Sequence, residues 1–301
     1  MRDQAMDSQR DEQMRLRNLR ASLSGLMRFR IAAELVYGLT GPCSFLFNVA
    51  ALKNRFQHAK EESLNIEHGE APEEFLWNDS RFHRTTGSGP ELRLTYRATV
   101  DLTPDVQENR DLPVRTLAQL PKEVLIYLFP SRYCQSDSLL RFAQSEFLTS
   151  KLTGFELVTR VCNWIYEKVA YQRGATTSIT SAFDTVTERQ GVCRDFAHLG
   201  IALCRALGIP ARFVSAYAYG LVPPDFHAVF EAYLGDRWYL FDSTRMSPQS
   251  SFVRVGMGRD AADTSFATFF GPATFKSMNV TMEADGDAKP QFVTQPISSS
   301  D

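Results

Sequence analysis

The sequence predicts an α+β protein, in which an all-β domain precedes a core of helices and an antiparallel sheet. Three observations support this fold class. Apolar and polar residues alternate in the first part of the chain, helical periodicity replaces this alternation near residue 130, and strand-like runs follow the last helix. With 301 residues, 44% of them hydrophobic and 23% charged, the chain is long enough for two domains with sizeable cores.

The β domain is expected over residues 27–130. Apolar residues occupy alternate positions from Met27 to Tyr37 and, more strictly, from Leu92 to Leu102. Such alternation is typical of strands with one face in a core and the other in water. We therefore predict a small sandwich. The charged segment before it, residues 1–26, is expected to be a disordered tail or not part of the native protein.

The core is expected over residues 131–285, ahead of a flexible tail at 286–301. Ser136-Asp137-Ser138 predicts a helix N-cap, and helical spacing of apolar residues predicts a helix from about Phe155 to Val169. A second helix begins at Cys193 and stops before Pro210. Three strand-like runs follow it: Arg212–Tyr219, His227–Leu234 and Arg237–Asp242.

Cys193 stands where a loop becomes an apolar helix. The N-terminus of a helix carries partial positive charge and unpaired backbone N–H groups. A thiol at this position loses its proton more readily, and the thiolate is the nucleophilic form. Cys193 is therefore a candidate nucleophile, and a base and an orienting acid can be sought downstream.

His227 opens one predicted strand and Asp242 closes the next, with Gly235-Asp236 between them as a two-residue hairpin turn. If the strands pair directly across this turn, Asp242 lies opposite Val229, which points to the same face as His227. The His227 and Asp242 Cα atoms are then diagonal neighbours about 7–8 Å apart, a gap that their side chains can close. A one-residue slip of register would destroy this arrangement.

These three residues suit nucleophilic catalysis. The Asp242 carboxylate would accept a hydrogen bond from one ring nitrogen of His227, which fixes the tautomer and stabilises the imidazolium. The other nitrogen would take the proton of Cys193 and later give it to the leaving group. We predict Cys193, His227 and Asp242 as the catalytic residues, although sequence alone does not bring Cys193 near His227.

The segments around these residues resemble those of bacterial transglutaminase-like proteins. The resemblance is carried by a nucleophile motif, a helix-to-strand turn, a histidine motif and an aspartate motif: Gly191–His198, Arg205–Arg212, His227–Glu231 and Phe241–Thr244. Ser131–Asp137 resembles the segment that joins the family's N-terminal β domain to its catalytic core. The resemblance covers roughly residues 27–285.

The resemblance implies a papain-like core, with the cysteine on a helix packed against a sheet that carries the histidine and the aspartate. It also implies attack on a carboxamide or peptide carbonyl through a thioester, ending in hydrolysis, deamidation or transamidation. Two positions depart from the family pattern. Val229 replaces the usual aromatic residue after His-Ala, and Ser243 replaces the usual proline after the aspartate. These departures leave the substrate preference more open than the chemistry.

Other polar residues of the nucleophile helix have simpler explanations. Cys204 lies in an apolar run and is expected in the core. His198 is expected to be hydrogen-bonded near the core, and Asp195 to favour the positive end of the helix dipole. Arg194 could lie at the edge of the cleft. The spacing of Cys193, His198 and Cys204 is not that of a zinc site, so no metal is predicted.

The oxyanion of the reaction needs hydrogen-bond donors. The backbone N–H of Cys193 is expected to be one of them. Papain-like enzymes use a Gln as the second donor and animal transglutaminases a Trp; Gln190 and Trp164 are present, but neither aligns with these positions, so the second donor stays unassigned. The acidic cluster Glu283–Asp287 lacks the spacing of a calcium loop. We predict no cofactor.

Composition narrows the partners and the location. A formal net charge of −2 gives no indication of a nucleic-acid partner. No stretch reaches about 18 uncharged apolar residues, and the N-terminal segment has no apolar region after its charges, so neither a membrane span nor a secretory signal is expected. The five widely spaced cysteines favour a reducing compartment. A cytoplasmic location is therefore predicted, and the oligomeric state is left open.

The leading functional hypothesis is a cysteine protease or amidase acting on a peptide or protein substrate. Hydrolysis is favoured over transamidation, because a cleft that excludes competing acceptors is the more demanding design. An acyl transferase acting on small-molecule amines, in the manner of arylamine acetyltransferases, could use the same three residues. A binding module, in which the β domain recruits a partner and the core serves as a scaffold, is the third alternative.

Overall fold

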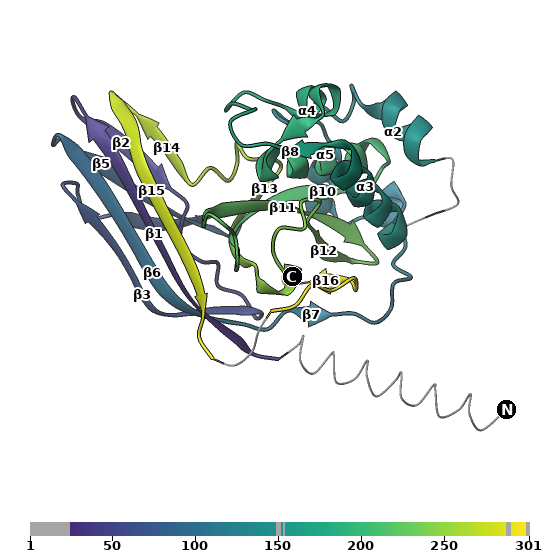
Figure 1. The fold of residues 1–301 in the computed structure, drawn as a ribbon, viewed down its shortest axis with the longest axis horizontal. Helices are drawn as coiled ribbons and strands as arrows, with labels where there is room; N and C mark the ends of the chain where they lie inside the picture. The colour runs from purple at the N-terminus through teal and green to yellow at the C-terminus, as the bar shows by residue number, and fades with distance from the viewer. Residues whose placement is uncertain (1–24, 149–151, 153, 287–289, 299–301) are drawn as a thin grey trace.

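The computed structural model describes residues 25–148, 152, 154–286 and 290–298. Figure 1 shows two bodies side by side, a sandwich of long strands and a core in which helices lie on one side of another sheet. The predicted tail at 1–26 lies outside the described residues, except for its last two.

The sandwich consists of two four-stranded antiparallel sheets, in the orders β15-β1-β6-β3 and β14-β2-β5-β4. Its strands are β1 (Met27–Leu39), β2 (Cys43–Phe47), β3 (Gln57–Glu67), β4 (Glu73–Trp77), β5 (Ser80–Gly87), β6 (Glu91–Leu102), β14 (Ala267–Phe270) and β15 (Ala273–Ala284). Strands β1 and β6 confirm the two alternating segments and pair from Met27↔Leu102 to Gly38↔Glu91. The alternating apolar side chains of β1 are buried in the core of the sandwich.

Two strands of the sandwich come from the far end of the chain. Strand β15 pairs with β1 from Phe29↔Ala284 to Leu39↔Ala273, and β14 pairs with β2. The prediction that residues 131–285 form one core domain is therefore wrong at its C-terminal end. Strand β6 covers one edge of β1, and β15 satisfies the backbone N–H and C=O groups of the other. Sequence periodicity does not show which edge a distant strand will join.

The core contains a four-stranded antiparallel sheet in the order β12-β11-β10-β13. Its strands and helices are β10 (Ala211–Tyr217), β11 (Phe226–Leu234), β12 (Arg237–Phe241), β13 (Val253–Gly258), α2 (Leu140–Phe147), α3 (Gly154–Lys168), α4 (Ala182–Glu188) and α5 (Cys193–Ala206). The other elements are short: β7 (Asp105–Val106), β8 (Ala170–Tyr171), β9 (Gln190–Gly191), β16 (Ile297–Ser298), η1 (Leu117–Gln119), η2 (Lys122–Leu128) and η3 (Gln249–Ser251). The predicted core strands and the two predicted long helices are confirmed. The strand ends lie within two residues of the predicted ones, and α5 ends at Ala206, ahead of Pro210.

Helix α5 is the central element of the core. All of its residues from Asp195 to Arg205 are buried. A Cβ atom at Gly200 would lie 2.5 Å from Cε1 of Phe230, so the missing side chain lets α5 approach β11 closely. At the other end, Arg205 donates from Nε and Nη2 to the carbonyl of Ala211, at 3.0 and 2.8 Å. These contacts fix the helix relative to the sheet.

Two local predictions differ from the structure. The helix expected after Ser136-Asp137-Ser138 begins at Leu140, and no side-chain hydrogen bond caps its start; Ser136 is buried instead. In the predicted tail at 286–301, Ile297 pairs with Val106 and is 1% exposed. Val293 packs against the same small cluster. The polar composition of the segment hides these apolar residues, so a strand, β16, stands where a flexible tail was expected.

The sandwich and the core share apolar surface. Tyr217 of β10 and Val253 and Val255 of β13 belong to the same apolar cluster as the sandwich residues. The buried Tyr217 hydroxyl also donates to the carbonyl of Val49, at 2.8 Å. The sandwich therefore packs directly against the β10–β13 side of the core sheet.

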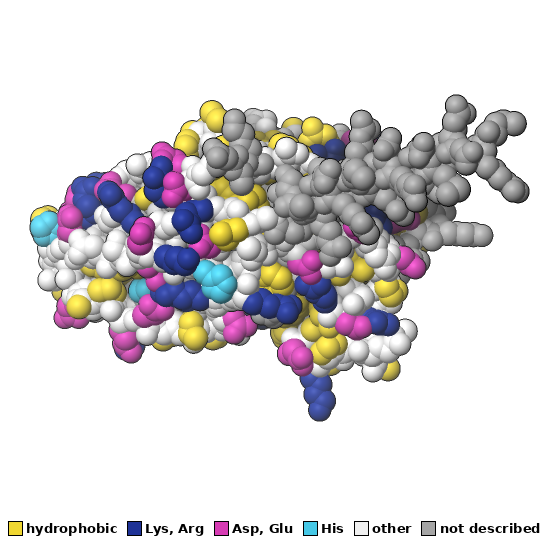
Figure 2. All heavy atoms as spheres, turned by 90° about the horizontal axis from the view of Figure 1, so that it is seen from below, with side chains coloured by type: hydrophobic (Ala, Val, Ile, Leu, Met, Phe, Trp, Pro, Cys, Tyr) yellow, Lys and Arg dark blue, Asp and Glu magenta, His cyan; other side chains and the backbone are white. Residues whose placement is uncertain are grey.

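The described surface carries both signs of charge. On the face shown in Figure 2, acidic and basic side chains lie among one another, as expected for a chain with nearly balanced charge. None of the described helices combines the length and the apolar composition needed to cross a bilayer.

Candidate active site

Cys193 is the first residue of α5 and is partly exposed. The turn that carries it is held by Asp195, whose Oδ2 accepts hydrogen bonds from the Val192 N–H at 2.9 Å and from the Thr176 hydroxyl at 2.6 Å. The guanidinium of Arg194 donates to the other carboxylate oxygen, at 3.0 Å. The predicted place of Asp195 at the N-terminus of the helix is thus confirmed, and Arg194 supports the same carboxylate.

His227 and Asp242 lie next to each other, as the hairpin predicted. Strands β11 and β12 pair in the expected register, with Leu234 opposite Arg237. The His227 Nε2 and Asp242 Oδ2 atoms are 3.0 Å apart, and both side chains are about 1% exposed. Because Nε2 faces the carboxylate, Nδ1 is the nitrogen left for Cys193.

The second oxygen of the Asp242 carboxylate is also held. Thr244 donates to Oδ1 from its backbone N–H at 2.8 Å and from its hydroxyl at 2.7 Å. The ring of Phe252 packs beside the imidazole, with centroids 5.4 Å apart. The orientation of His227 is therefore fixed from two sides. These roles of Thr244 and Phe252 are not predicted from the sequence; only the position of Thr244, two residues after Asp242, was a usable signal.

The charge state of His227 follows from its neighbours. Burial alone would lower its pKa, but the charge and hydrogen bond of Asp242 outweigh burial and raise the pKa to about 10. Cys193 contributes in the same direction, through a hydrogen bond and through the negative charge of its thiolate form. The structure thus brings the three predicted residues together and favours the imidazolium form of His227.

A second carboxylate, that of Asp225, lies two residues before His227 in the chain. Asp225 Oδ1 accepts a hydrogen bond from the Phe226 N–H, at 2.8 Å. Burial raises the pKa of Asp225, whereas this hydrogen bond and the charges of Arg173 and His227 oppose the rise.

The two departures from the family pattern, Val229 and Ser243, are both buried.

The other sequence candidates lie in the core. Cys204 is fully buried, and burial raises the pKa of its thiol well above the ordinary value. His198 is also fully buried, and its Nε2 accepts the Ala261 N–H at 3.1 Å. Its ring stacks on Tyr133, with centroids 4.9 Å apart. Within the described ranges, no cluster of three His, Cys, Asp or Glu side chains has the geometry to hold a metal ion.

Within the described part of the chain, no hydrogen bond or ring contact joins Trp164 or Gln190, the two residues considered for the second oxyanion donor, to the three predicted catalytic side chains. Trp164 packs on Phe142 and under the guanidinium of Arg189. The Gln190 side chain reaches Glu188, at 3.5 Å. A different residue, Tyr171, lies beside Cys193.

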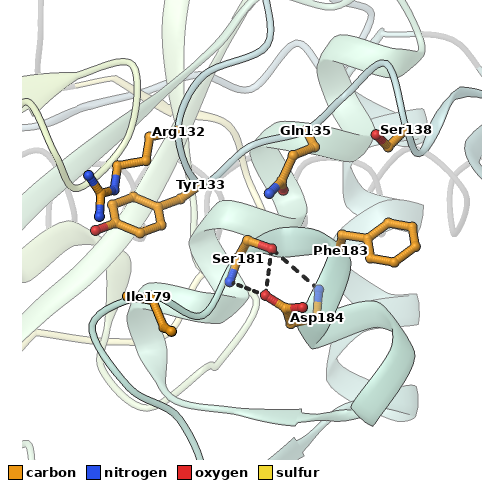
Figure 3. Close-up of a pocket in the computed structure, with 8 residues that line it drawn as sticks. All are labelled: Arg132, Tyr133, Gln135, Ser138, Ile179, Ser181, Phe183 and Asp184. Atoms are coloured by element: carbon orange, nitrogen blue, oxygen red, sulfur yellow. Dashed lines mark hydrogen bonds between the residues drawn. The ribbon is translucent and has the colours of Figure 1, made fainter.

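A separate pocket of about 490 Å³ lies between the segment Arg132–Ser138 and the start of α4 (Figure 3). Ser181 and Asp184 hydrogen-bond to each other there, with Ser181 Oγ and Asp184 Oδ2 2.7 Å apart. The lining of this pocket includes none of the three predicted catalytic residues. It is therefore distinct from the candidate active site.

Comparison with known proteins identifies relatives of both parts of the chain. Residues 27–122 match the bacterial transglutaminase N-terminal domain, and residues 143–243 match the transglutaminase-like superfamily. The chain is similar to a solved structure from Cytophaga hutchinsonii that is provisionally named a cysteine protease. The two share 43% identity and a TM-score of 0.87, over 91% of this chain and 98% of that chain.

Curated relatives match smaller segments. An uncharacterised protein of Mycobacterium leprae is 31% identical over 116 residues, which cover 36% of this chain and 42% of that protein. One of Mycobacterium tuberculosis (strain ATCC 25618 / H37Rv) is 29% identical over 143 residues, or 42% and 45% of the two chains. The chain thus spans less than half the length of these relatives. Both parts of the chain nevertheless match the domains that the motifs predicted, and the Cytophaga structure matches nearly its full length. The chain belongs to the transglutaminase-like superfamily, with a bacterial transglutaminase N-terminal domain ahead of its α+β core.

Proposed function

We propose that this protein is a thiol enzyme that acts on carboxamide or peptide bonds of a peptide or protein substrate through a thioester on Cys193. The observation that carries the proposal is the buried hydrogen bond of 3.0 Å between His227 and Asp242, beside the helix end where Cys193 stands. At the family level, the comparisons support a thiol enzyme and leave the reaction open.

In the proposed reaction the Cys193 thiolate attacks the carbonyl carbon. A carbon–sulfur bond forms, and the π electron pair of the carbonyl moves to its oxygen. When this intermediate collapses, the carbon–nitrogen bond breaks and His227 gives its proton to the leaving amine or ammonia. Water or an amine then attacks the thioester, His227 takes the proton of that acceptor, and the thiolate leaves.

Hydrolysis is the outcome we favour. Transamidation needs a site that admits an amine while it keeps water from the thioester, which is the more demanding arrangement. The proposal therefore places the chain with cysteine proteases and amidases first, and with transamidases or deamidases second.

The proposal can be tested with dimethylcasein as substrate and monodansylcadaverine as amine donor. Three products are followed: new peptide N-termini, released ammonia and incorporated dansyl group. We expect the wild-type protein to form at least one of them and Cys193→Ala to form none. Cys204→Ala, which removes a buried thiol from the same helix, is the matched control and should remain active.

Other outcomes would favour the alternatives. Full turnover by Cys193→Ala would overturn the proposal. An acetyl adduct on Cys193 formed from acetyl-coenzyme A, without any product from casein, would favour an acyl transferase acting on small amines. A Cys193 thiol no more reactive than Cys204 would favour a binding module.

A further inference from the structure

A short parallel strand pair places Tyr171 at the start of α5. In this pair Tyr171 of β8 lies opposite Gly191 of β9. Backbone hydrogen bonds fix the pairing, with Ala170 N donating to the Arg189 carbonyl at 2.8 Å and Gln172 N to the Gly191 carbonyl at 2.9 Å. Because Gly191 precedes the first helical residue by two positions, the Tyr171 backbone is held at the N-terminus of the helix.

The side chain of Tyr171 lies along the first turn of α5. Its ring packs on Phe196, with centroids 5.7 Å apart, and Phe196 is 2% exposed. The phenol hydroxyl interacts with two groups of Cys193, the backbone N–H and the thiol. Tyr171 itself is 37% exposed. Tyr171 therefore lies beside the nucleophile and is partly open to solvent.

The backbone N–H of Cys193 is the expected first donor to the oxyanion. A second donor has to lie close to this N–H and close to the sulfur, because the oxyanion forms on the carbon that the sulfur attacks. The β8–β9 pairing and the ring contact with Phe196 hold the Tyr171 phenol beside the first turn of α5, where Cys193 stands, and the interaction of the phenol with Cys193 agrees with this placement. Resting on the proposed thioester chemistry, we propose that the Tyr171 hydroxyl is the second donor of the oxyanion hole.

The hydroxyl would follow the negative charge during the reaction. In the substrate-free site the phenol interacts with Cys193. When the carbon–sulfur bond forms, the negative charge passes from sulfur to the former carbonyl oxygen, and the hydroxyl turns to donate to that oxygen. When the intermediate collapses, the C=O double bond is restored, and the phenol keeps its own proton throughout.

The protonation state of the phenol fits this role. Burial and the charge of Cys193 raise the pKa of Tyr171 to about 12. The phenol is therefore protonated at neutral pH and can act as a donor.

The test compares two reactions of the same thiol in Tyr171→Phe, which keeps the ring and removes the hydroxyl. Acylation of Cys193 by p-nitrophenyl acetate passes through an oxyanion, whereas alkylation by iodoacetamide does not. We expect acylation to slow by about 10- to 100-fold, a somewhat smaller effect than loss of a fully buried donor. Alkylation should change by less than about threefold at every pH from 5 to 9.

Tyr133→Phe is the matched control, because its hydroxyl donates to the Ser178 carbonyl, at 2.8 Å, and not to Cys193. It should leave both reactions unchanged. Equal slowing of acylation and alkylation in Tyr171→Phe would show that the phenol acts on the thiol or on the fold, and would overturn the proposal. No slowing of acylation would also overturn it. If wild-type Cys193 reacted with neither reagent, the proposed function itself would fail, and this inference with it.

Discussion

At the scale of single residues, the site depends on how one carboxylate is held. Both oxygens of Asp242 are engaged, one by His227 and the other by the N–H and hydroxyl of Thr244. A carboxylate held at both oxygens keeps the imidazole from rotating, so Nδ1 stays available to Cys193. This requirement predicts that Thr244 matters for catalysis although it does not touch a substrate.

Thr244→Val tests this role. The substitution removes the hydroxyl bond to Asp242 and keeps both the backbone N–H bond and the size of the side chain. We expect acylation of Cys193 by p-nitrophenyl acetate to slow by about tenfold, because a hydrogen bond to a charged group contributes about 1.5 kcal/mol. Thr187→Val on α4, whose hydroxyl donates to the Phe183 carbonyl, should react at the wild-type rate. A wild-type rate in Thr244→Val would contradict the argument.

The raised pKa of His227 predicts a pH dependence of stability. A group whose pKa rises from 6.5 unfolded to about 10 folded adds stability that is fully present below about pH 6.5 and is lost as the pH rises through about 10. The measurement belongs in a Cys193→Ala background, in which the contribution of Cys193 to the raised pKa of His227 is lost and the larger contribution of Asp242 remains. We expect the free energy of unfolding in urea to fall between pH 7 and pH 10. An equal fall in Cys193→Ala/His227→Gln would contradict the assignment.

At the scale of elements, the hairpin and the nucleophile helix differ in what the sequence determines. A two-residue turn fixes the register of β11 against β12, so the proximity of His227 to Asp242 could be predicted locally. The distance from Cys193 to His227 depends instead on how α5 lies on the sheet. That placement rests on contacts such as Gly200 with Phe230, between residues far apart in the sequence. The place of Tyr171 beside Cys193 likewise depends on the β8–β9 pairing, which joins residues twenty positions apart. The sequence therefore did not predict this neighbour of Cys193.

The close approach of α5 to β11 predicts a steric cost at Gly200. In Gly200→Ala the new Cβ would overlap the Phe230 ring, where the nearest carbon is 2.5 Å away. We expect the free energy of unfolding in urea to drop by about 1–3 kcal/mol, as in other overpacked cores. Phe230→Leu makes room for the methyl group, so the double variant should lose less than the sum of the two single variants. Strict additivity would show that the two residues do not oppose each other.

At the scale of the whole molecule, each sheet of the sandwich takes one edge strand from the C-terminal part of the chain. Strands β14 and β15 follow the core in sequence and close both sheets of the sandwich. Changes in composition and periodicity along the sequence predicted the β domain and the core. They did not predict that β14 and β15 would join the sandwich. Pairing between strands more than two hundred residues apart leaves no local pattern.

This topology predicts the effect of truncation. A chain that ends at Phe266 loses β14 and β15 and exposes the edge of β1, so it should lose cooperative thermal unfolding and aggregate. A chain that ends at Asp285 keeps both strands and loses only the two-residue strand β16 among the described elements. It should unfold cooperatively, and circular dichroism at increasing temperature distinguishes the two. A cooperative transition in the shorter chain, at the temperature of the longer one, would contradict this account of the sandwich.

The central claim is that Cys193 is a nucleophile activated by His227. The most direct test is iodoacetamide labelling of all five cysteines in the native protein from pH 5 to pH 9, read by mass spectrometry, with and without His227→Ala. We predict that Cys193 alone reacts fast at pH 6 and loses this advantage when His227 is replaced. A Cys193 that reacts no faster than the other thiols, or that reacts equally fast without His227, would contradict the claim.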